Sequence, residues 1–173
     1  MSTLDEQLAN AYLAEARRQF QLIAGRVHHA VEQLDDSQVW WRAADEFNSV
    51  GNLVLHLIGN ISERILDLVG GQTHRRDRDR EFSQREVIPK AELLARCDAT
   101  LTAVDGVLAG VPAARLLETR RYRMLTGEVE NTLVGIILQN LVHVGGHTQE
   151  IIALARQQLG KKYRFQLSAN PAS

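Results

Sequence analysis

The sequence is poor in the residues that cross-link or interrupt small domains. Among 173 residues it has one cysteine, Cys97, and three prolines. A single cysteine excludes a disulfide within the chain, which favours a reducing compartment. Aromatic residues make up only 5%, whereas hydrophobic residues make up 45% and charged residues 24%. These proportions exclude a disordered or fibrous protein and are typical of one globular domain.

The sequence also lacks an excess of charge of one sign and a long apolar run. Lys and Arg number 20 against 21 Asp and Glu, so the formal net charge is -1 at pH 7. Because nucleic-acid binders usually carry a basic excess, we predict no nucleic-acid partner. The most apolar stretch, residues 132–144, is interrupted by Gln139, Asn140 and His143, and a membrane span needs roughly 18 apolar residues. The first residues are polar and acidic, unlike a signal peptide. We therefore expect a cytoplasmic protein that does not contact a membrane.

Hydrophobic residues recur at helical spacing in four segments. They predict helices at residues 4–34, 50–69 and 89–108, and a last helix that begins near residues 128–132 and ends at 159. We interpret residues 72–89 and 113–127 as connectors, and no segment is a convincing strand. The sequence therefore predicts an all-α protein, a four-helix bundle over residues 1–160 followed by a C-terminal tail at 161–173.

The connector between the second and third predicted helices bears on the topology. At about 18 residues it can reach ~55 Å when extended, whereas a 20-residue helix is only ~30 Å long. These two helices can therefore run parallel, joined by a long crossover. The same length also permits a hairpin.

Two histidines lie one turn apart in the last predicted helix. His143 and His147 are four residues apart and share a face. Two neutral imidazoles at this spacing can bind one divalent metal ion. His56 has a matching setting on the second predicted helix, between Asn52 and Asn60. Three histidines on two helices would leave coordination positions open for water and substrate, as in catalytic metal sites.

Gly145 and Gly146 separate the two histidines of the last helix. Each glycine costs ~1 kcal/mol relative to alanine inside a helix. We expect either a close approach of a neighbouring helix or room for a ligand to explain them.

Other kinds of metal site fit the sequence less well. A zinc-protease helix has a glutamate directly after its first histidine, where this chain has Val144. A ferritin-like di-iron centre needs Glu-x-x-His on two helices, and no such pair occurs in the sequence. A simpler interpretation stays open, in which the histidines are hydrogen-bonded residues at the edge of the core.

Two runs of the sequence resemble a known group of proteins. They are Asn-Ser-Val-Gly-Asn-Leu-Val-Leu-His-Leu-Ile-Gly-Asn at residues 48–60 and His-Val-Gly-Gly-His-Thr-Gln-Glu-Ile at residues 143–151. Their order and spacing resemble the DinB/YfiT-like superfamily of metalloenzymes, and within it a branch of unknown function. The resemblance covers nearly the whole chain, including Gly70-Gly71 and residues 78–82.

The resemblance implies a fold, a site and an activity. It implies an up-down-down-up bundle and a divalent metal, zinc or nickel, bound by His56, His143 and His147. It also implies a homodimer and a thiol-dependent S-transferase or isomerase.

Several further residues are candidates for the surroundings of the site. Asn60, Asn140 and Glu150 could accept the second N–H of a metal-ligating histidine. Residues 74–81 alternate arginines with acids, which is typical of a solvated, salt-bridged loop. In a second interpretation, one of these arginines holds a substrate carboxylate above the metal by a bidentate contact. Cys97 lies on the apolar line of the third helix and is expected to be buried.

These observations lead to two hypotheses from different classes. In the first, the protein is a metal-dependent enzyme that lowers the pKa of a bound water or of a low-molecular-weight thiol cosubstrate and acts on a small molecule. No catalytic residue is assigned beyond the metal ligands, and hydrolysis is the alternative to thiol transfer. In the second, the protein is a non-catalytic metal-binding or dimerisation bundle in a stress response. An open coordination position would favour the enzyme, and a fourth protein ligand such as Glu150 would favour the structural role.

Overall fold

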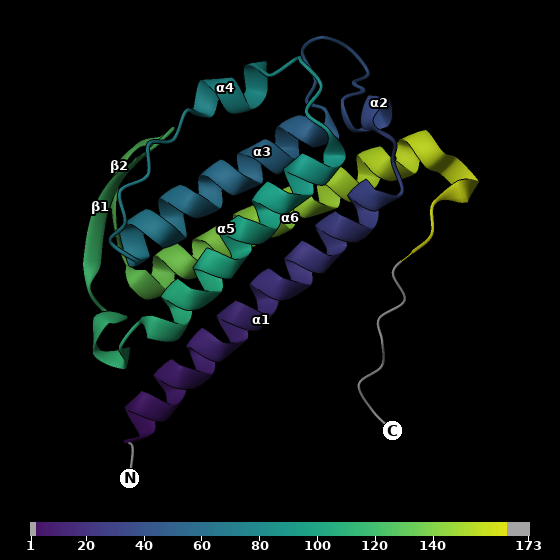
Figure 1. Cartoon of the computed structure of the whole chain (residues 1–173). Coiled ribbons are helices and arrows are strands. Elements are labelled where there is room, and N and C mark those ends of the chain that lie inside the picture. The colour runs from purple at the N-terminus through teal and green to yellow at the C-terminus, as the bar shows by residue number, and fades with distance from the viewer. Residues whose placement is uncertain (1–2, 166–173) are drawn as a thin grey trace, which may run out of the picture.

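The computed structural model describes residues 3–165 and is mostly helical (Figure 1). Along the chain the elements are α1 (Leu4–Glu32), α2 (Asp36–Val39), α3 (Val50–Ile61), the π-helical segment η1 (Ser62–Val69), α4 (Arg78–Ser83), α5 (Lys90–Gly110), the 3-10 turn η2 (Ala113–Arg115), β1 (Thr119–Met124), β2 (Gly127–Thr132), α6 (Leu133–Leu159) and the 3-10 turn η3 (Gly160–Lys162). The two strands pair only with each other, so helices dominate the architecture.

The four long helices lie side by side and enclose the core (Figure 1). Helices α1 and α3 each pack against both α5 and α6, while η1 extends α3 along the same two neighbours. The core residues of α1 follow the heptad line that the sequence predicts, with Leu13, Phe20 and Val27 all buried. Burial of this apolar line is the main driving force that holds α1 against its neighbours.

Side chains at the helix starts explain where α1 and α3 begin. Thr3 and Glu6 form a capping box at α1, and Ser49 and Asn52 form one at α3. Each box satisfies backbone N–H groups that have no partner within the helix. The second predicted helix therefore begins at Val50, as expected, and sets the phase that points His56 inward.

The prediction that no strand is present is wrong, because residues 119–132 form an antiparallel hairpin. Its Cα register runs from Thr119 opposite Thr132 to Met124 opposite Gly127, whose φ of 122° suits only glycine. The strands alternate exposed and half-buried residues, but arginines and glutamates occupy many of the positions. The hydrophobic alternation that signals a strand in a sequence is therefore missing. The last helix begins at Leu133, after the hairpin, rather than at 128–132.

The connector at residues 72–89 is also more structured than predicted. It contains α4, which packs against α3. Asn52 on α3 holds it there, since its amide nitrogen donates to the backbone oxygens of Glu81 (2.9 Å) and Gln84 (3.1 Å). A single buried side chain thus fixes the crossover over the face of α3 that carries His56.

The chain end is described only in part. Residues 166–173 of the predicted tail lie outside the described residues. Before them, η3 follows α6 and Tyr163 is 9% exposed. Among residues 3–165, no helix combines the length and hydropathy that crossing a membrane requires.

Candidate metal centre

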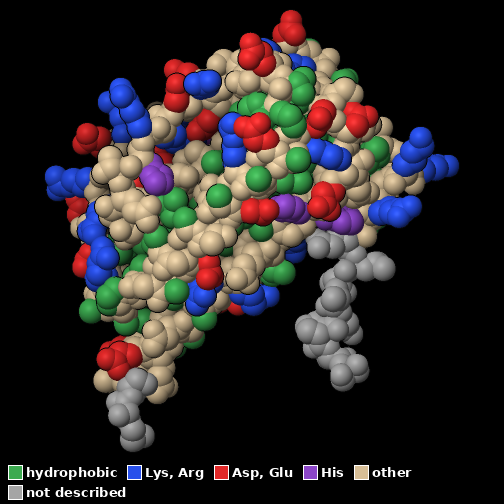
Figure 2. Space-filling model, viewed as in Figure 1, with side chains coloured by type: hydrophobic (Ala, Val, Ile, Leu, Met, Phe, Trp, Pro, Cys, Tyr) green, Lys and Arg blue, Asp and Glu red, His purple; other side chains and the backbone are tan. Residues whose placement is uncertain are grey.

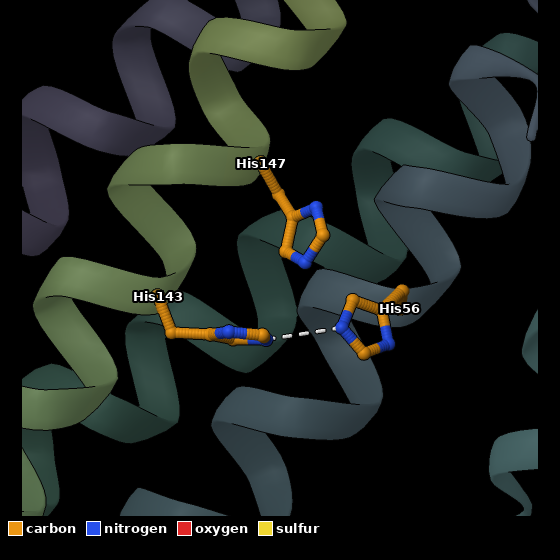
Figure 3. A group of neighbouring side chains, drawn as sticks. All are labelled: His56, His143 and His147. Carbon is orange, nitrogen blue, oxygen red and sulfur yellow. Dashed lines mark hydrogen bonds between the residues drawn. The ribbon is translucent and has the colours of Figure 1, made fainter.

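The three predicted histidines meet between α3 and α6 (Figure 3). His56 projects from α3, and His143 and His147 project from successive turns of α6 toward it. One ring nitrogen from each lies within 4.8 Å of the others, and the Nε2 atoms of His56 and His143 are 3.0 Å apart. Nitrogens bound tetrahedrally to one zinc ion at ~2.0–2.1 Å are separated by roughly 3.3 Å. The donor set and its spacing therefore fit a divalent metal.

Helical phase explains why these side chains share one side of α6. The neighbours Asn140, Val144 and Thr148 face the core and are buried, and His143 and His147 lie beside that line. His56 is 4% exposed, whereas His147 is half-buried and His143 is exposed. The cluster is thus closed on the α3 side and open on the side of His143.

A carboxylate that sequence analysis missed holds His56. Oε2 of Glu81, on α4, is 2.9 Å from Nδ1 of His56, and Glu81 is 7% exposed. A carboxylate can only accept here, so Nδ1–H of His56 donates and Nε2 keeps its lone pair for a metal. This is the carboxylate–histidine–metal arrangement that orients ligands in metalloproteins.

Arg76 neutralises this buried carboxylate. Its Nε donates to Oε1 of Glu81 at 2.7 Å and its Nη2 to Oε2 at 2.8 Å, while Nη1 donates to Glu63 at 2.9 Å. Burial by itself would raise the pKa of Glu81, but the hydrogen bonds from Arg76 and His56 outweigh it and hold that pKa below its usual value. The pKa of Arg76 is correspondingly raised, since its two carboxylate partners outweigh its own burial. Both groups are therefore charged at neutral pH.

Gly59 makes room for Glu81 to reach His56. A Cβ at this position of α3 would lie 1.9 Å from Oε1 of Glu81, far inside van der Waals contact. Gly59 is one turn from His56 on the same helix. Only a residue without a side chain lets α4 place a carboxylate against the imidazole.

His147 and His143 differ in how they are held. Nδ1 of His147 is 2.9 Å from Oε2 of Glu150, one turn further along α6. Among residues 3–165, His143 has a ring-nitrogen contact only with His56. Partial burial, followed by the positive charge of the neighbouring histidines and of Arg76 and Arg64, lowers the pKa of His143 to about 4. Its imidazole is therefore neutral at pH 7, which is the form that binds metals.

The two predicted asparagines contact each other rather than a histidine. Nδ2 of Asn140 donates to Oδ1 of Asn60 at 2.6 Å and joins α6 to α3 beside the site. Oδ1 of Asn140 is buried and has no hydrogen-bond partner among the described residues.

The other histidines lie away from this cluster. His28 contacts Asp98 at 2.7 Å and His29 contacts the backbone oxygen of Arg164, while His74 is half-buried in the crossover. Nor do Gly145 and Gly146 mark a close helix approach, because a Cβ on either would meet no described atom within 4 Å. The expectation that a close approach of a neighbouring helix explains these two glycines is therefore wrong.

A cavity of about 990 Å³ opens over the three histidines. Four arginines and a single acidic residue, Glu63, line it, together with Phe82, Met124 and Ile136. The arginines come from η1, the crossover and the hairpin, so the unpredicted strands help to form the cavity. Its volume suits a small-molecule ligand.

The fold and the site define a mostly helical protein with a three-histidine cluster that could hold a metal ion at the base of a cavity. The chain belongs to the family described as protein of unknown function (DUF1572), whose model matches residues 7–171. No curated protein matches the chain.

Proposed function

We propose that this protein is a divalent-metal-dependent enzyme of the DinB/YfiT-like type, with His56, His143 and His147 as the metal ligands. The observation that carries the proposal is the convergence of three imidazoles on an open cavity, with the Nδ1 atoms of His56 and His147 held by carboxylates. In Figure 1, α1 and α6 run in one direction and α3 and α5 in the other. This supports an up-down-down-up bundle, the fold of that superfamily.

The openness of the cluster favours catalysis over a structural metal site. Structural zinc sites have four protein ligands, whereas catalytic sites have three and an open position. Glu150 is engaged with Nδ1 of His147 and so lies behind that ligand rather than in a fourth position. A cavity large enough for a substrate adjoins the exposed side of His143.

The reaction that we propose is transfer of a low-molecular-weight thiol to an electrophile. A bound zinc or nickel ion would lower the pKa of the thiol so that its thiolate attacks at neutral pH. The protein supplies three imidazole ligands, and Glu81 and Glu150 contact the Nδ1 atoms of two of them, which leaves the Nε2 atoms of those two to the metal. The arginines around the cavity stabilise negative charge that develops there.

The first test is metal content, measured by mass spectrometry on tag-free protein. We expect near one zinc or nickel per chain, and its loss in a His143→Ala/His147→Ala variant. A matched control is His28→Ala/His29→Ala, which removes two histidines outside the cluster and is expected to keep the metal. Absence of metal from the parent after incubation with zinc and nickel would contradict the proposal.

The second test is activity with thiols and a model electrophile such as chlorodinitrobenzene. In that reaction a carbon–sulfur bond forms, chloride leaves and the thiol proton goes to solvent. We expect turnover by the metal-loaded parent and none by the double-histidine variant. Full metal content without thiol consumption or hydrolysis would favour the non-catalytic metal-binding bundle.

A further inference from the structure

Only some of the arginines around the cavity form ion pairs with carboxylates of the described chain. Arg76 is 9% exposed and forms ion pairs with Glu81 and Glu63. Arg64 lies over the ring of Tyr122, 4.3 Å from its centroid, and its Nη2 is 3.5 Å from Glu63. Arg78 stacks on Phe82, and neither Arg78 nor Arg123 has an ion-pair partner among residues 3–165. The cavity mouth therefore presents positive charge that no carboxylate of the described chain neutralises.

The charges around the cavity are strongly unequal. Its lining contains Arg64, Arg76, Arg78 and Arg123 but only Glu63 on the acidic side. With Glu81, which pairs with Arg76 behind the lining, a formal excess of two positive charges remains. The chain as a whole has a net charge of -1. Figure 2 shows Lys and Arg side chains along the edge formed by β1 and β2, with acidic ones among them. The excess is thus local to the cavity and does not follow from composition.

Three separate elements bring these arginines together. Arg64 comes from η1, Arg78 from the start of α4 and Arg123 from β1. The aromatic rings of Tyr122 and Phe82 support two of them, which restricts the guanidinium planes. Arg64 is also engaged through Nη2, which donates to the backbone oxygen of Arg123 at 3.4 Å, whereas Arg78 and Arg123 are exposed. Planar guanidinium groups match the geometry of carboxylate and phosphate oxygens.

The rest of the cavity wall constrains the same ligand further. Phe82, Met124 and Ile136 provide apolar surface between the arginines and the histidines. An inorganic anion would use none of this surface, whereas an organic molecule with an acidic group would use all of it.

We propose that the cavity binds a small organic anion, an apolar body with a carboxylate or phosphate that Arg78 and Arg123 hold at the mouth. The body then extends along Phe82 and Ile136 toward the histidines. The inference deepens the proposed function and rests on it for the role of the anion as substrate, but the anion contacts themselves do not require a metal.

The test compares two double variants of the full-length chain. Arg78→Gln/Arg123→Gln removes the two exposed, unpaired arginines of the cavity, so the fold loses no buried contact. Arg80→Gln/Arg121→Gln removes the same charge from the same two elements, α4 and β1, at positions that do not line this cavity. Calorimetric titrations use phenylacetate, phenyl phosphate and the neutral isostere 2-phenylacetamide.

We expect both anions to bind the parent and 2-phenylacetamide to bind at least about tenfold more weakly, since a charge-assisted hydrogen bond contributes about that factor. The Arg78→Gln/Arg123→Gln variant should weaken anion binding at least about tenfold, and the control variant should stay within about twofold of the parent. The anion that binds with higher affinity shows whether the site prefers a carboxylate or a phosphate. Equal binding of the amide, no anion binding, or equal effects of the two variants would each overturn the inference.

Metal content separates this inference from the proposed function. The same titrations on the His143→Ala/His147→Ala variant should retain anion binding through the arginines. Retained anion binding in a parent that holds no metal would overturn the proposed enzyme while supporting the anion site. Anion binding that disappears with the histidines would overturn the assignment of the anion to the arginines.

Discussion

At the residue scale, Glu81 illustrates how a site depends on a group far from its ligands in sequence. It lies 25 positions after His56, on a separate helix, yet its carboxylate is 2.9 Å from the imidazole. The carboxylate is kept charged in a buried position by Arg76. Loss of Glu81 would still leave Arg76 its ion pair with Glu63, whereas loss of Arg76 would leave the buried Glu81 with His56 as its remaining side-chain partner among the described residues.

Replacement of Glu81 by glutamine should therefore weaken metal binding more than it changes the fold. The amide has nearly the same shape but cannot neutralise Arg76, and it can present a donor to Nδ1 of His56 in place of an acceptor. We expect a 10- to 100-fold loss of zinc affinity, the range found when such partners are removed, in competition titrations with a chromophoric chelator. Asp79→Asn, at an exposed site on the same helix, is the control. Unchanged affinity in Glu81→Gln would show that Glu81 does not orient the ligand.

Cys97 provides a second prediction at this scale, on pH dependence. Burial, with a smaller contribution from Asp98, raises the pKa of its thiol to about 12. Because the unfolded chain loses this proton at lower pH, the contribution of Cys97 to stability is complete below about pH 9 and declines as the pH rises toward 12. At pH 8 the native thiolate fraction is about one in ten thousand.

We therefore expect the native protein to react far more slowly with a disulfide reagent at pH 8 than the same protein in urea. A Cys97→Ala variant should show no reaction in either state. Rapid labelling of the native protein would mean that the thiol is accessible. A nucleophilic role for Cys97 would then have to be tested.

At the scale of elements, the crossover is a structural part of the site. Residues 72–89 place Arg76 and Glu81 behind His56 and Arg78 at the cavity mouth. The docking of α4 depends on Asn52, which is fully buried and also completes the capping box of α3. One amide thus links the start of α3 to the position of the carboxylate.

Replacement of Asn52 by alanine should weaken the docking of α4 on α3 and also lower the stability of the whole protein. It leaves the backbone oxygens of Glu81 and Gln84 without this partner, at a cost of about 1–3 kcal/mol in the free energy of unfolding. Hydrogen exchange should become faster in residues 78–84 before other regions, and urea unfolding should shift to lower concentrations. Asn48→Ala, at the neighbouring loop position, is the control. Equal exchange in both variants would argue against Asn52 as the anchor.

At the scale of the whole molecule, α1 and α6 carry apolar side chains that nothing in residues 3–165 covers. Helices α1 and α6 pack together, and Leu8 (61% exposed), Leu138 (54%) and Val142 (71%) project from them. Exposed apolar side chains on adjacent helices are typical of a subunit interface. We propose that a second copy of the chain packs against these exposed side chains of α1 and α6 to form a homodimer.

A Leu138→Glu/Val142→Glu variant should therefore be monomeric while it keeps its metal. Each glutamate would have to lose its hydration in the apolar contact between copies. Light scattering after size exclusion measures the mass, and metal content shows that the fold persists. A Leu117→Glu/Leu125→Glu variant, at exposed leucines of the connector before β1 and of the hairpin turn, controls for added charge. A monomeric parent would end this proposal.

The spacing of hydrophobic residues in the sequence determined the positions of the long helices. The sequence also identified the three histidines as candidate ligands. Periodicity of 3.6 residues placed Leu13, Phe20 and Val27 on one buried line, and the four-residue spacing of His143 and His147 placed both on one face. Capping residues and glycines marked helix ends within a few positions. These features depend on neighbours within a turn or two, so the sequence records them directly.

Only the tertiary structure decided how the site is completed. Glu81, Arg76 and Arg78 lie in a charged connector with no periodicity, and Arg123 lies in a hairpin whose charged strands hide their alternation. These residues are brought to His56 and to the cavity by contacts such as those of Asn52 and Gly59. Such contacts join residues far apart in the chain, and their energies depend on burial and geometry that exist only after the helices have packed.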